Sequence, residues 1–334
     1  MHGWTATMAG VATLACAATA WTPAVCAQSL DAVASTPAEP WLIESAGRVA
    51  SGILVVSSVH RAGLFTVAEN AALVPFGPTD RQAMFGLVSE MGRSSIWVTS
   101  SPSPNDDRED RPAELLQIEI NSGELIGTFG ADGEGHVFGD IALGPDGAVY
   151  VADGGTRQIL VLRPGQSRLQ PLVQLPERGS PQGMVVSPDG RWLVFANYGT
   201  GLHRIDLAEG LALRDFSTGA FAPLAGPEGV ELRGIDGLMG WETDGLIAIQ
   251  NGTQTPRVLR LRLAPDWSEV SRREALLEGG ALSEPTTGYI EGGDQLIFVS
   301  RSQWTDFDRA GRPTSETPAP AVVSRFLIPL EPQP

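Results

Sequence analysis

The sequence has only two cysteines, Cys16 and Cys26, and both lie in its first 27 residues. That segment combines an apolar run of small residues with Val25-Cys26-Ala27, which has the small-x-small form of a secretory cleavage site, although Met1 to Trp4 lack the usual basic residues. We therefore expect residues 1–27 to be a signal peptide and residues 28–334 to be exported, either to the periplasm or out of the cell. The mature chain would then contain no cysteine, which excludes disulfides, a thiol nucleophile and a thiolate metal site.

Positive charge is also scarce. Arginine and lysine together number 23 against 39 acidic residues, and the formal net charge is −16. Because residues 1–27 contain no charged side chain, this excess belongs to residues 28–334. A surface of that sign repels phosphate backbones and anionic lipids, so we expect no nucleic-acid partner.

Long apolar runs and helical periodicity are missing as well. After residue 30 no apolar run is long enough to span a membrane. Apolar residues do not recur at the three- and four-residue spacing that indicates an amphipathic helix. With 39 Gly and 25 Pro among 334 residues, the chain instead suits one large all-β domain with many turns.

The clearest run of short strands lies between Ser180 and Leu207. Met184-Val185-Val186 is predicted as one strand, Ser187-Pro188-Asp189-Gly190 as a turn, and Trp192 to Ala196 as a second strand. In the Pro-Asp-Gly turn, Pro presets φ, Asp bonds its own backbone and Gly accepts a positive φ. A third strand is expected before Leu207, so the whole stretch is typical of an antiparallel meander.

This unit occurs six times along the chain. Its second strands stand roughly 42 to 54 residues apart, a spacing typical of four-stranded propeller blades, and their cores are Leu54–Val56, Ile96–Val98, Val149–Val151, Leu193–Phe195, Ile247–Ile249 and Ile297–Val299. A two-sheet sandwich also has many short strands but needs no repeating unit. We predict an all-β fold, a six-bladed β-propeller. Only one strong strand follows residue 321, so we expect a segment within residues 29–43 to close the ring.

Two inserts and one long connection interrupt the repeats. The inserts are residues 102–112, which are charged and rich in proline, and residues 302–321, which contain Trp304; the connection is residues 217–233. In a propeller, the loop between the second and third strands opens on the same face as the start of the first strand. We therefore expect all three segments to lie around one mouth of the central channel.

Polar side chains occupy the positions that should face this mouth. Near the start of the innermost strands stand Glu44, Asp140, Gln182 and Asp236, and the second strands end in or next to Asp153, Asn197, Asn251 and Arg301. His60 lies in a loop on the same rim. Converging carboxylate and amide oxygens suit a hard divalent cation such as Ca²⁺ or Mg²⁺. Asp and Asn are also common as caps of strand ends, and this alternative stays open for each residue.

Two runs carry a resemblance to known proteins: Ile235-Asp236-Gly237 in blade five and Phe138 to Asp153 in blade three. Through them, blades three to five resemble the regucalcin/gluconolactonase family, which includes luciferin-regenerating enzymes, and residues 138–159 also resemble an NHL repeat. Members of that family are six-bladed propellers with a divalent metal in the channel. The resemblance implies Asp236 as metal ligand and acid/base, and Asp140 and Gln182 where the family has asparagines. It also implies Glu44 as a first-blade ligand, for which Glu39-Pro40-Trp41 is an alternative fit.

Two functions follow from these observations. The first is an exported lactonase-like hydrolase that acts on a small, sugar-derived lactone or ester, with Ca²⁺, Zn²⁺ or Mg²⁺ at the channel and Asp236 as the catalytic group. Substrate would then be bound by His60, Asp153, Asn197, Asn251 and Arg301. The second is a propeller without enzymatic activity that binds a small molecule or a protein on its elaborated face. We expect a monomer in either case. A Ser-His-acid triad has little support, because His60, His136 and His203 are the only histidines of the mature chain.

Overall fold

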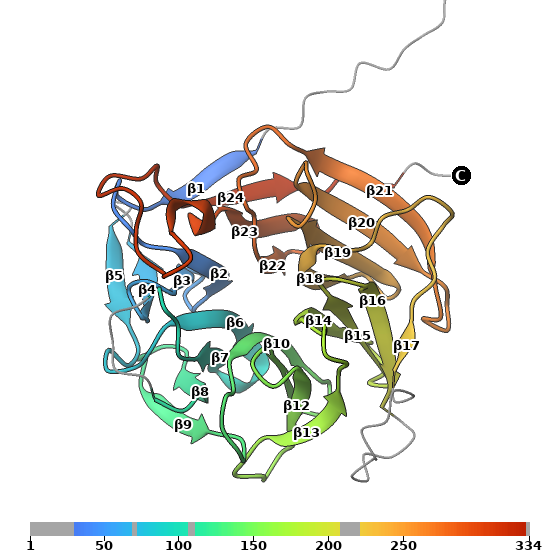
Figure 1. Cartoon of the computed structure of the whole chain (residues 1–334), viewed down its shortest axis with the longest axis horizontal. Coiled ribbons are helices and arrows are strands. Elements are labelled where there is room, and N and C mark those ends of the chain that lie inside the picture. The colour runs from blue at the N-terminus through green and yellow to red at the C-terminus, as the bar shows by residue number, and fades with distance from the viewer. Residues whose placement is uncertain (1–29, 69–71, 106–110, 208–220, 332–334) are drawn as a thin grey trace, which may run out of the picture.

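The six apolar cores identified in the sequence all form second strands of four-stranded antiparallel sheets, and the sheets are arranged as a ring (Figure 1). The computed structural model describes residues 30–68, 72–105, 111–207 and 221–331. The predicted signal peptide lies outside these residues, as does the middle of the first insert. The fold is a six-bladed β-propeller, as predicted, and its described helices are two 3₁₀ turns, η1 (Met91–Arg93) and η2 (Trp304–Asp306).

The first three blades run from residue 43 to residue 174. Blade one contains β2 (Ile43–Arg48), β3 (Leu54–Ser58), β4 (Gly63–Val67) and β5 (Leu73–Phe76). Blade two contains β6 (Met84–Glu90), β7 (Ser95–Ser100), β8 (Glu114–Glu119) and β9 (Leu125–Phe129). Blade three contains β10 (Phe138–Leu143), β11 (Val149–Asp153), β12 (Gln158–Leu162) and β13 (Gln170–Gln174).

The last three blades complete the ring. Blade four contains β14 (Pro181–Val186), β15 (Trp192–Asn197), β16 (Gly201–Asp206) and β17 (Ala222–Pro223). Blade five contains β18 (Ile235–Trp241), β19 (Gly245–Gln250), β20 (Arg257–Leu263) and β21 (Val270–Glu278). Blade six contains β22 (Gly288–Glu291), β23 (Gln295–Arg301), β24 (Val322–Leu327) and, as its outermost strand, β1 (Asp31–Ser35).

The ring is closed by its amino-terminal strand, as the strand count predicts. β1 pairs antiparallel with β24, and Asp31 lies opposite Arg325 while Ser35 lies opposite Val322. A strand from the start of the chain thus covers an edge that would otherwise expose unpaired backbone groups. The first and last strands of the chain are thus paired within blade six, which closes the ring.

The core lies between the blades rather than within any one of them. Every residue of β11 and of β19 is buried, because neighbouring blades cover both faces of a second strand. A strand buried on both faces has a continuous apolar sequence instead of an alternating one. At the boundary of blades four and five, for example, Val194 and Leu202 pack with Leu246 and Leu259.

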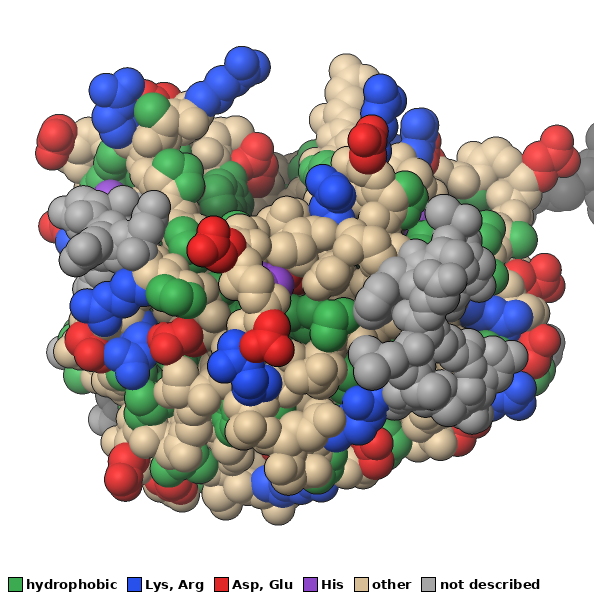
Figure 2. Space-filling model, turned by 60° about the horizontal axis from the view of Figure 1, so that its bottom comes forward, with side chains coloured by type: hydrophobic (Ala, Val, Ile, Leu, Met, Phe, Trp, Pro, Cys, Tyr) green, Lys and Arg blue, Asp and Glu red, His purple; other side chains and the backbone are tan. Residues whose placement is uncertain are grey.

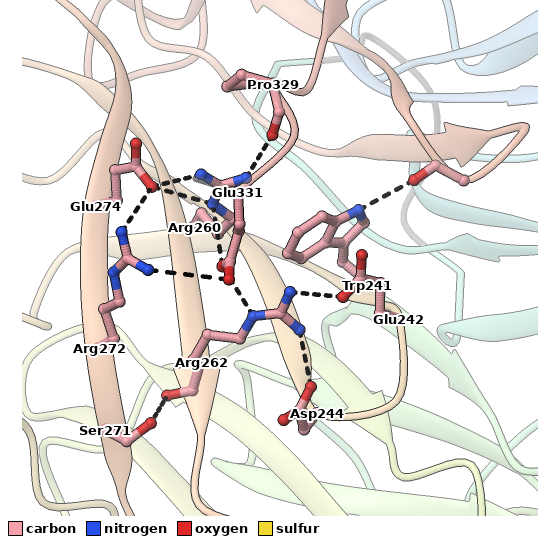
Figure 3. A network of polar contacts seen from close by, with 11 residues as sticks. Trp241, Glu242, Asp244, Arg260, Arg262, Ser271, Arg272, Glu274, Pro329 and Glu331 are labelled. Atoms are coloured by element: carbon pink, nitrogen blue, oxygen red, sulfur yellow. Dashed lines mark hydrogen bonds and ion pairs between the residues drawn. The ribbon is translucent and has the colours of Figure 1, made fainter. Parts of the chain in front are cut away.

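The carboxyl end of the described chain forms a second set of contacts between blades five and six (Figure 3). Arg260 is only 2% exposed in its side chain; it donates to Pro329 O and to Glu274. Arg262 binds Glu331 at 2.9 Å and stacks over the ring of Trp241 at 4.4 Å. Trp241 in turn donates its indole N–H to Gly293 O in blade six at 3.0 Å. These contacts hold the chain end on blade five, while β24 belongs to blade six.

Candidate functional site

Bulges near the start of the innermost strands set the direction of the channel side chains. In β18, Asp236 and Gly237 together stand opposite a single residue of β19, because Ile235 pairs with Gln250 and Leu238 with Ala248. The same two-against-one arrangement occurs at Gly139-Asp140 in β10 and at Gln182-Gly183 in β14. A bulge leaves the extra residue out of the ladder and redirects its side chain. Asp140, Gln182 and Asp236 are directed into the channel in this way.

Glycines beside these residues let the innermost strands approach one another closely. A Cβ added at Gly237 would lie 2.9 Å from Thr286 O, and one added at Gly183 would meet the backbone of Asp236 and Leu238. Any larger residue would therefore push neighbouring blades apart. The close approach brings residues from all six blades around one small space.

That space is a cavity of about 380 Å³ at one mouth of the channel. Five of the predicted site residues line it: Glu44, Asp140, Gln182, Asp236 and Asn251. Glu284, a carboxylate that precedes the first strand of blade six, lines it too, together with the aromatic residues Phe85, Phe138, Tyr198 and Trp304. The second insert thus lies at the mouth that holds Asp140 and Asp236, as strand parity predicts. Pro104 of the first insert approaches Gly311 of the second.

The carboxylates in this cavity raise one another's pKa values. Burial, followed by the charge of Asp236, raises the pKa of Asp140 from 3.8 to about 8. Burial likewise raises the pKa of Asp236 to about 6, against the opposing effect of a hydrogen bond from Asn251. The pKa of Glu44 lies well above its ordinary value because of burial and of the charges on Asp236 and Asp140. The side chains keep part of their surface on the cavity, so these groups are both desolvated and reachable.

Hydrogen bonds fix two of the carboxylates. Asn251 donates from Nδ2 to Asp236 Oδ2 at 2.6 Å, and its own Oδ1 accepts from the Tyr198 hydroxyl at 2.9 Å. Trp304 donates from Nε1 to Glu44 Oε2 at 2.6 Å. Hydrogen bonds to a charged acceptor are among the stronger ones in proteins, and they restrict the rotation of the acceptor side chain.

The other four predicted residues lie outside the lining of the cavity. Asp153 is fully buried, and its carboxylate accepts from the N–H groups of Val137, Gly155 and Thr156 and from the Thr156 hydroxyl. Asn197 accepts from Ser180 N at 3.0 Å. His60 Nδ1 lies 2.6 Å from Asn105 O, and Arg301 faces Asp306 at 3.4 Å. Contacts of this kind cap strand ends and hold loops in place.

Tyr198 and Trp304 were not predicted from the sequence as site residues. Tyr198 directly follows Asn197 at the end of the second strand of blade four, so its place on the channel face could have been read from that position. Trp304 is the third residue of an insert already assigned to this face. The sequence does not indicate which aromatic side chain of a loop points into the cavity.

The donor set of the cavity matches a hard divalent cation in type and in charge. Glu44, Asp140 and Asp236 supply carboxylates whose mutual repulsion a cation would relieve, and Gln182 supplies an amide oxygen, which Ca²⁺ also accepts. Among the described residues, no group of three or more His, Cys, Asp or Glu side chains is arranged so that it could hold a metal ion. Amide oxygens or water would therefore complete the set.

In metal-free protein, replacing Asp140 by Asn should raise stability at alkaline pH. A folded-state pKa of about 8 against 3.8 means that the folded chain binds the extra proton between these values, so the wild type loses stability as pH rises through that window. We expect the free energy of unfolding of Asp140→Asn to exceed that of the wild type by about 2–5 kcal/mol at pH 8.5 and by much less at pH 4. Urea denaturation with chelator at both pH values measures it. Asp132→Asn, at an exposed position, is the control; equal gains for both variants would contradict the account.

No family model and no characterised protein sequence matches this chain. Solved structures do match. A PQQ-bound aldose sugar dehydrogenase from Streptomyces coelicolor is 14% identical, with 89% of this chain and 98% of that chain covered and a TM-score of 0.60. A luciferin-regenerating enzyme is 13% identical, with 90% and 95% covered and a TM-score of 0.58. A periplasmic gluconolactonase from Pseudomonas aeruginosa is 13% identical, with 86% and 88% covered and a TM-score of 0.53.

These similarities confirm the predicted resemblance at the level of fold. The gluconolactonase and the luciferin-regenerating enzyme belong to the group that the sequence motifs indicate. The dehydrogenase shares the fold with a different chemistry, so the propeller alone does not assign an activity. An assignment has to come from the side chains of the cavity.

Proposed function

We propose that this chain is a lactonase-type hydrolase that opens a small lactone or ester in the channel-mouth cavity, with a divalent cation bound there. The observation that supports it most is Asp236. Its carboxylate is oriented by Asn251 and faces a cavity of substrate size, and in the metal-free chain burial raises its pKa to about 6. The gluconolactonase and the luciferin-regenerating enzyme of the same fold are consistent with this chemistry.

Asp236 is the proton carrier in the proposed reaction. Its carboxylate takes a proton from a water molecule while the water oxygen bonds to the carbonyl carbon of the ring. The tetrahedral intermediate then breaks its bond to the ring oxygen, and Asp236 returns the proton to that oxygen. One lactone and one water thus give one hydroxy acid. The residues that would hold the cation are Glu44, Asp140, Gln182 and Asp236, and a cation bound there would supply Lewis-acid polarisation of the carbonyl.

The charge of the cavity points to a neutral substrate. Among the described residues that line it, none is Arg, Lys or His, whereas four are carboxylates. Apart from the proposed cation, an anionic substrate group would meet carboxylates and no basic side chain, which is unfavourable. The product is itself an anion, so the same charges favour its departure. Tyr198 and Trp304 supply rings against which the faces of a sugar-derived ring can pack.

Turnover of a neutral aldonolactone should exceed that of the same lactone carrying a phosphate ester. We expect kcat/KM for the phosphorylated ring to be lower by about 10²-fold or more, because its dianion enters a cavity of carboxylates. Proton release in a pH-stat, at matched lactone concentrations and corrected for spontaneous opening, measures both. Equal rates, or a preference for the phosphorylated ring, would contradict the proposed substrate class.

We also propose that the protein is exported. Residues 1–27 have the composition of a signal peptide, and the gluconolactonase from Pseudomonas aeruginosa is described as periplasmic. Among the described residues, no helix is long and apolar enough to cross a bilayer. On the face shown in Figure 2, basic and acidic side chains are interspersed, and neither sign forms a continuous patch. A small solute therefore suits the protein better as a partner than a nucleic acid does.

A second candidate function is the binding of a small organic cation without turnover. Carboxylates beside Tyr198 and Trp304, with no basic residue among the described lining, form a site in which an ammonium group finds both charge and aromatic faces. Calorimetric titration with a quaternary ammonium salt would detect it. Tight binding of that cation, combined with no hydrolysis of any lactone, would favour the binding function.

A further inference from the structure

Trp304 is the residue of the second insert that reaches furthest toward the candidate metal ligands. Its indole Nε1 donates to Glu44 Oε2 at 2.6 Å, across 260 residues of sequence. The ring packs against Leu42, Val59 and Ala83, next to the start of β2. The contact thus joins a loop of blade six to the carboxylate of blade one.

The base of the insert is fixed rather than free to swing. Gln303 is 1% exposed; its Oε1 accepts from the N–H groups of Trp41 and Leu42 at 2.9 and 3.0 Å. Its Nε2 donates to Glu39 O and to Ala319 O at 3.2 and 2.8 Å. Such a buried amide with every group bonded holds its neighbours in one arrangement.

A second set of bonds ties the same segment to Glu44 from the other side. Ser302 O accepts from Ile43 N at 3.1 Å, directly before Glu44, and the Ser302 hydroxyl donates to Glu284 O at 2.7 Å. Thr286 donates to the backbone oxygen of Glu44 at 2.5 Å. The main chain of Glu44 and the indole that binds its side chain are therefore parts of one rigid corner between blades six and one.

We propose that Trp304 is a positioning residue that holds Glu44 for a divalent cation in the channel, and so sets the affinity of the site. The inference rests on the proposed function, because it requires the cation. A carboxylate held through one oxygen presents the other in a fixed direction and loses less rotamer freedom when an ion binds. Partners of this kind, one shell out from a metal, change its affinity by about 10- to 100-fold when they are removed.

The test is the affinity of the intact protein for Ca²⁺, Mg²⁺ and Zn²⁺, each titrated alone by calorimetry after chelator treatment. Trp304→Phe keeps an aromatic ring and removes the N–H, so we expect the dissociation constant of the bound metal to rise about 10- to 100-fold. The melting temperature should stay close to that of the wild type, since Trp304 is only half-buried.

Trp41→Phe is the matched control. Trp41 is buried beside the same corner, and its Nε1 is among the buried atoms without a hydrogen-bond partner. The same substitution there should leave the metal affinity within about threefold. A Trp304→Phe affinity within threefold of the wild type overturns the inference while the metal site stands. Equal losses in both variants overturn it as well, because they indicate loosened packing. No metal binding by the wild type overturns the inference together with the metal of the proposed function.

Discussion

Replacing Asp236 by Asn should lower the rate of lactone hydrolysis by at least about 10²-fold, the contribution of one general acid/base, while the propeller stays folded. Asn cannot carry the proton between water and the leaving oxygen, and it removes a negative donor from the proposed cation site. Folding should be little affected, because the change also relieves repulsion among Asp236, Glu44 and Asp140. The measurement is initial proton release by the purified variant and the wild type, with circular dichroism as the check on the fold.

An unchanged rate would show that Asp236 only caps the start of β18. In that case the substitution should cost about 1 kcal/mol or less and leave function alone, as for other lost caps. The hydrogen bond from Asn251 would then be a structural contact between strand ends. The substitution thus lowers the hydrolysis rate if Asp236 is the proton carrier, and lowers only the stability if Asp236 is a strand cap.

The same substitution at Asp153 should have the opposite profile. Asp153 is 0% exposed, and its two oxygens accept four hydrogen bonds besides facing His136 at 2.5 Å. The side-chain amide of Asn at this position would point its own N–H groups at the N–H groups from which Asp153 accepts hydrogen bonds. We expect Asp153→Asn to lower the free energy of unfolding by about 3–5 kcal/mol, as for other broken buried charge networks.

Chemical denaturation of Asp153→Asn beside Asp236→Asn measures this contrast, since both variants make the same chemical change at the end of a strand. Turnover per folded molecule should stay near the wild-type value for Asp153→Asn. A stable Asp153 variant with lost turnover would assign the residue to substrate binding instead, as the sequence expectation has it.

The blades could be predicted from the sequence because second strands are buried on both faces. That burial produces runs such as Val149-Tyr150-Val151, which periodicity detects without knowledge of the neighbours. The closing strand was also expected from counting, since β24 is the third strand of its blade and its outer edge needs a partner, which β1 supplies. Both features depend on local sequence and on the geometry of a closed ring.

The site could be predicted only in part, because its members differ in what surrounds them rather than in what they are. Asp153 and Asp236 are both aspartates at strand termini. The carboxylate of Asp153 accepts hydrogen bonds from backbone N–H groups, whereas that of Asp236 faces the cavity. The bulge that directs Asp236 inward depends on the register of two strands. Trp304 comes from a loop whose course is set by Gln303, through bonds that no periodicity reveals.

The central claim is that this cavity hydrolyses a lactone with a divalent cation. The most direct test is turnover of a neutral aldonolactone by protein loaded with Ca²⁺, Mg²⁺ or Zn²⁺, compared with chelator-treated protein, with the bound metal counted by mass spectrometry. We predict about one ion per chain and a rate that falls by about 10²-fold or more on chelation, in line with the several kcal/mol that a metal supplies. Hydrolysis at the same rate without metal, or no turnover of any neutral lactone with the site filled, would contradict it.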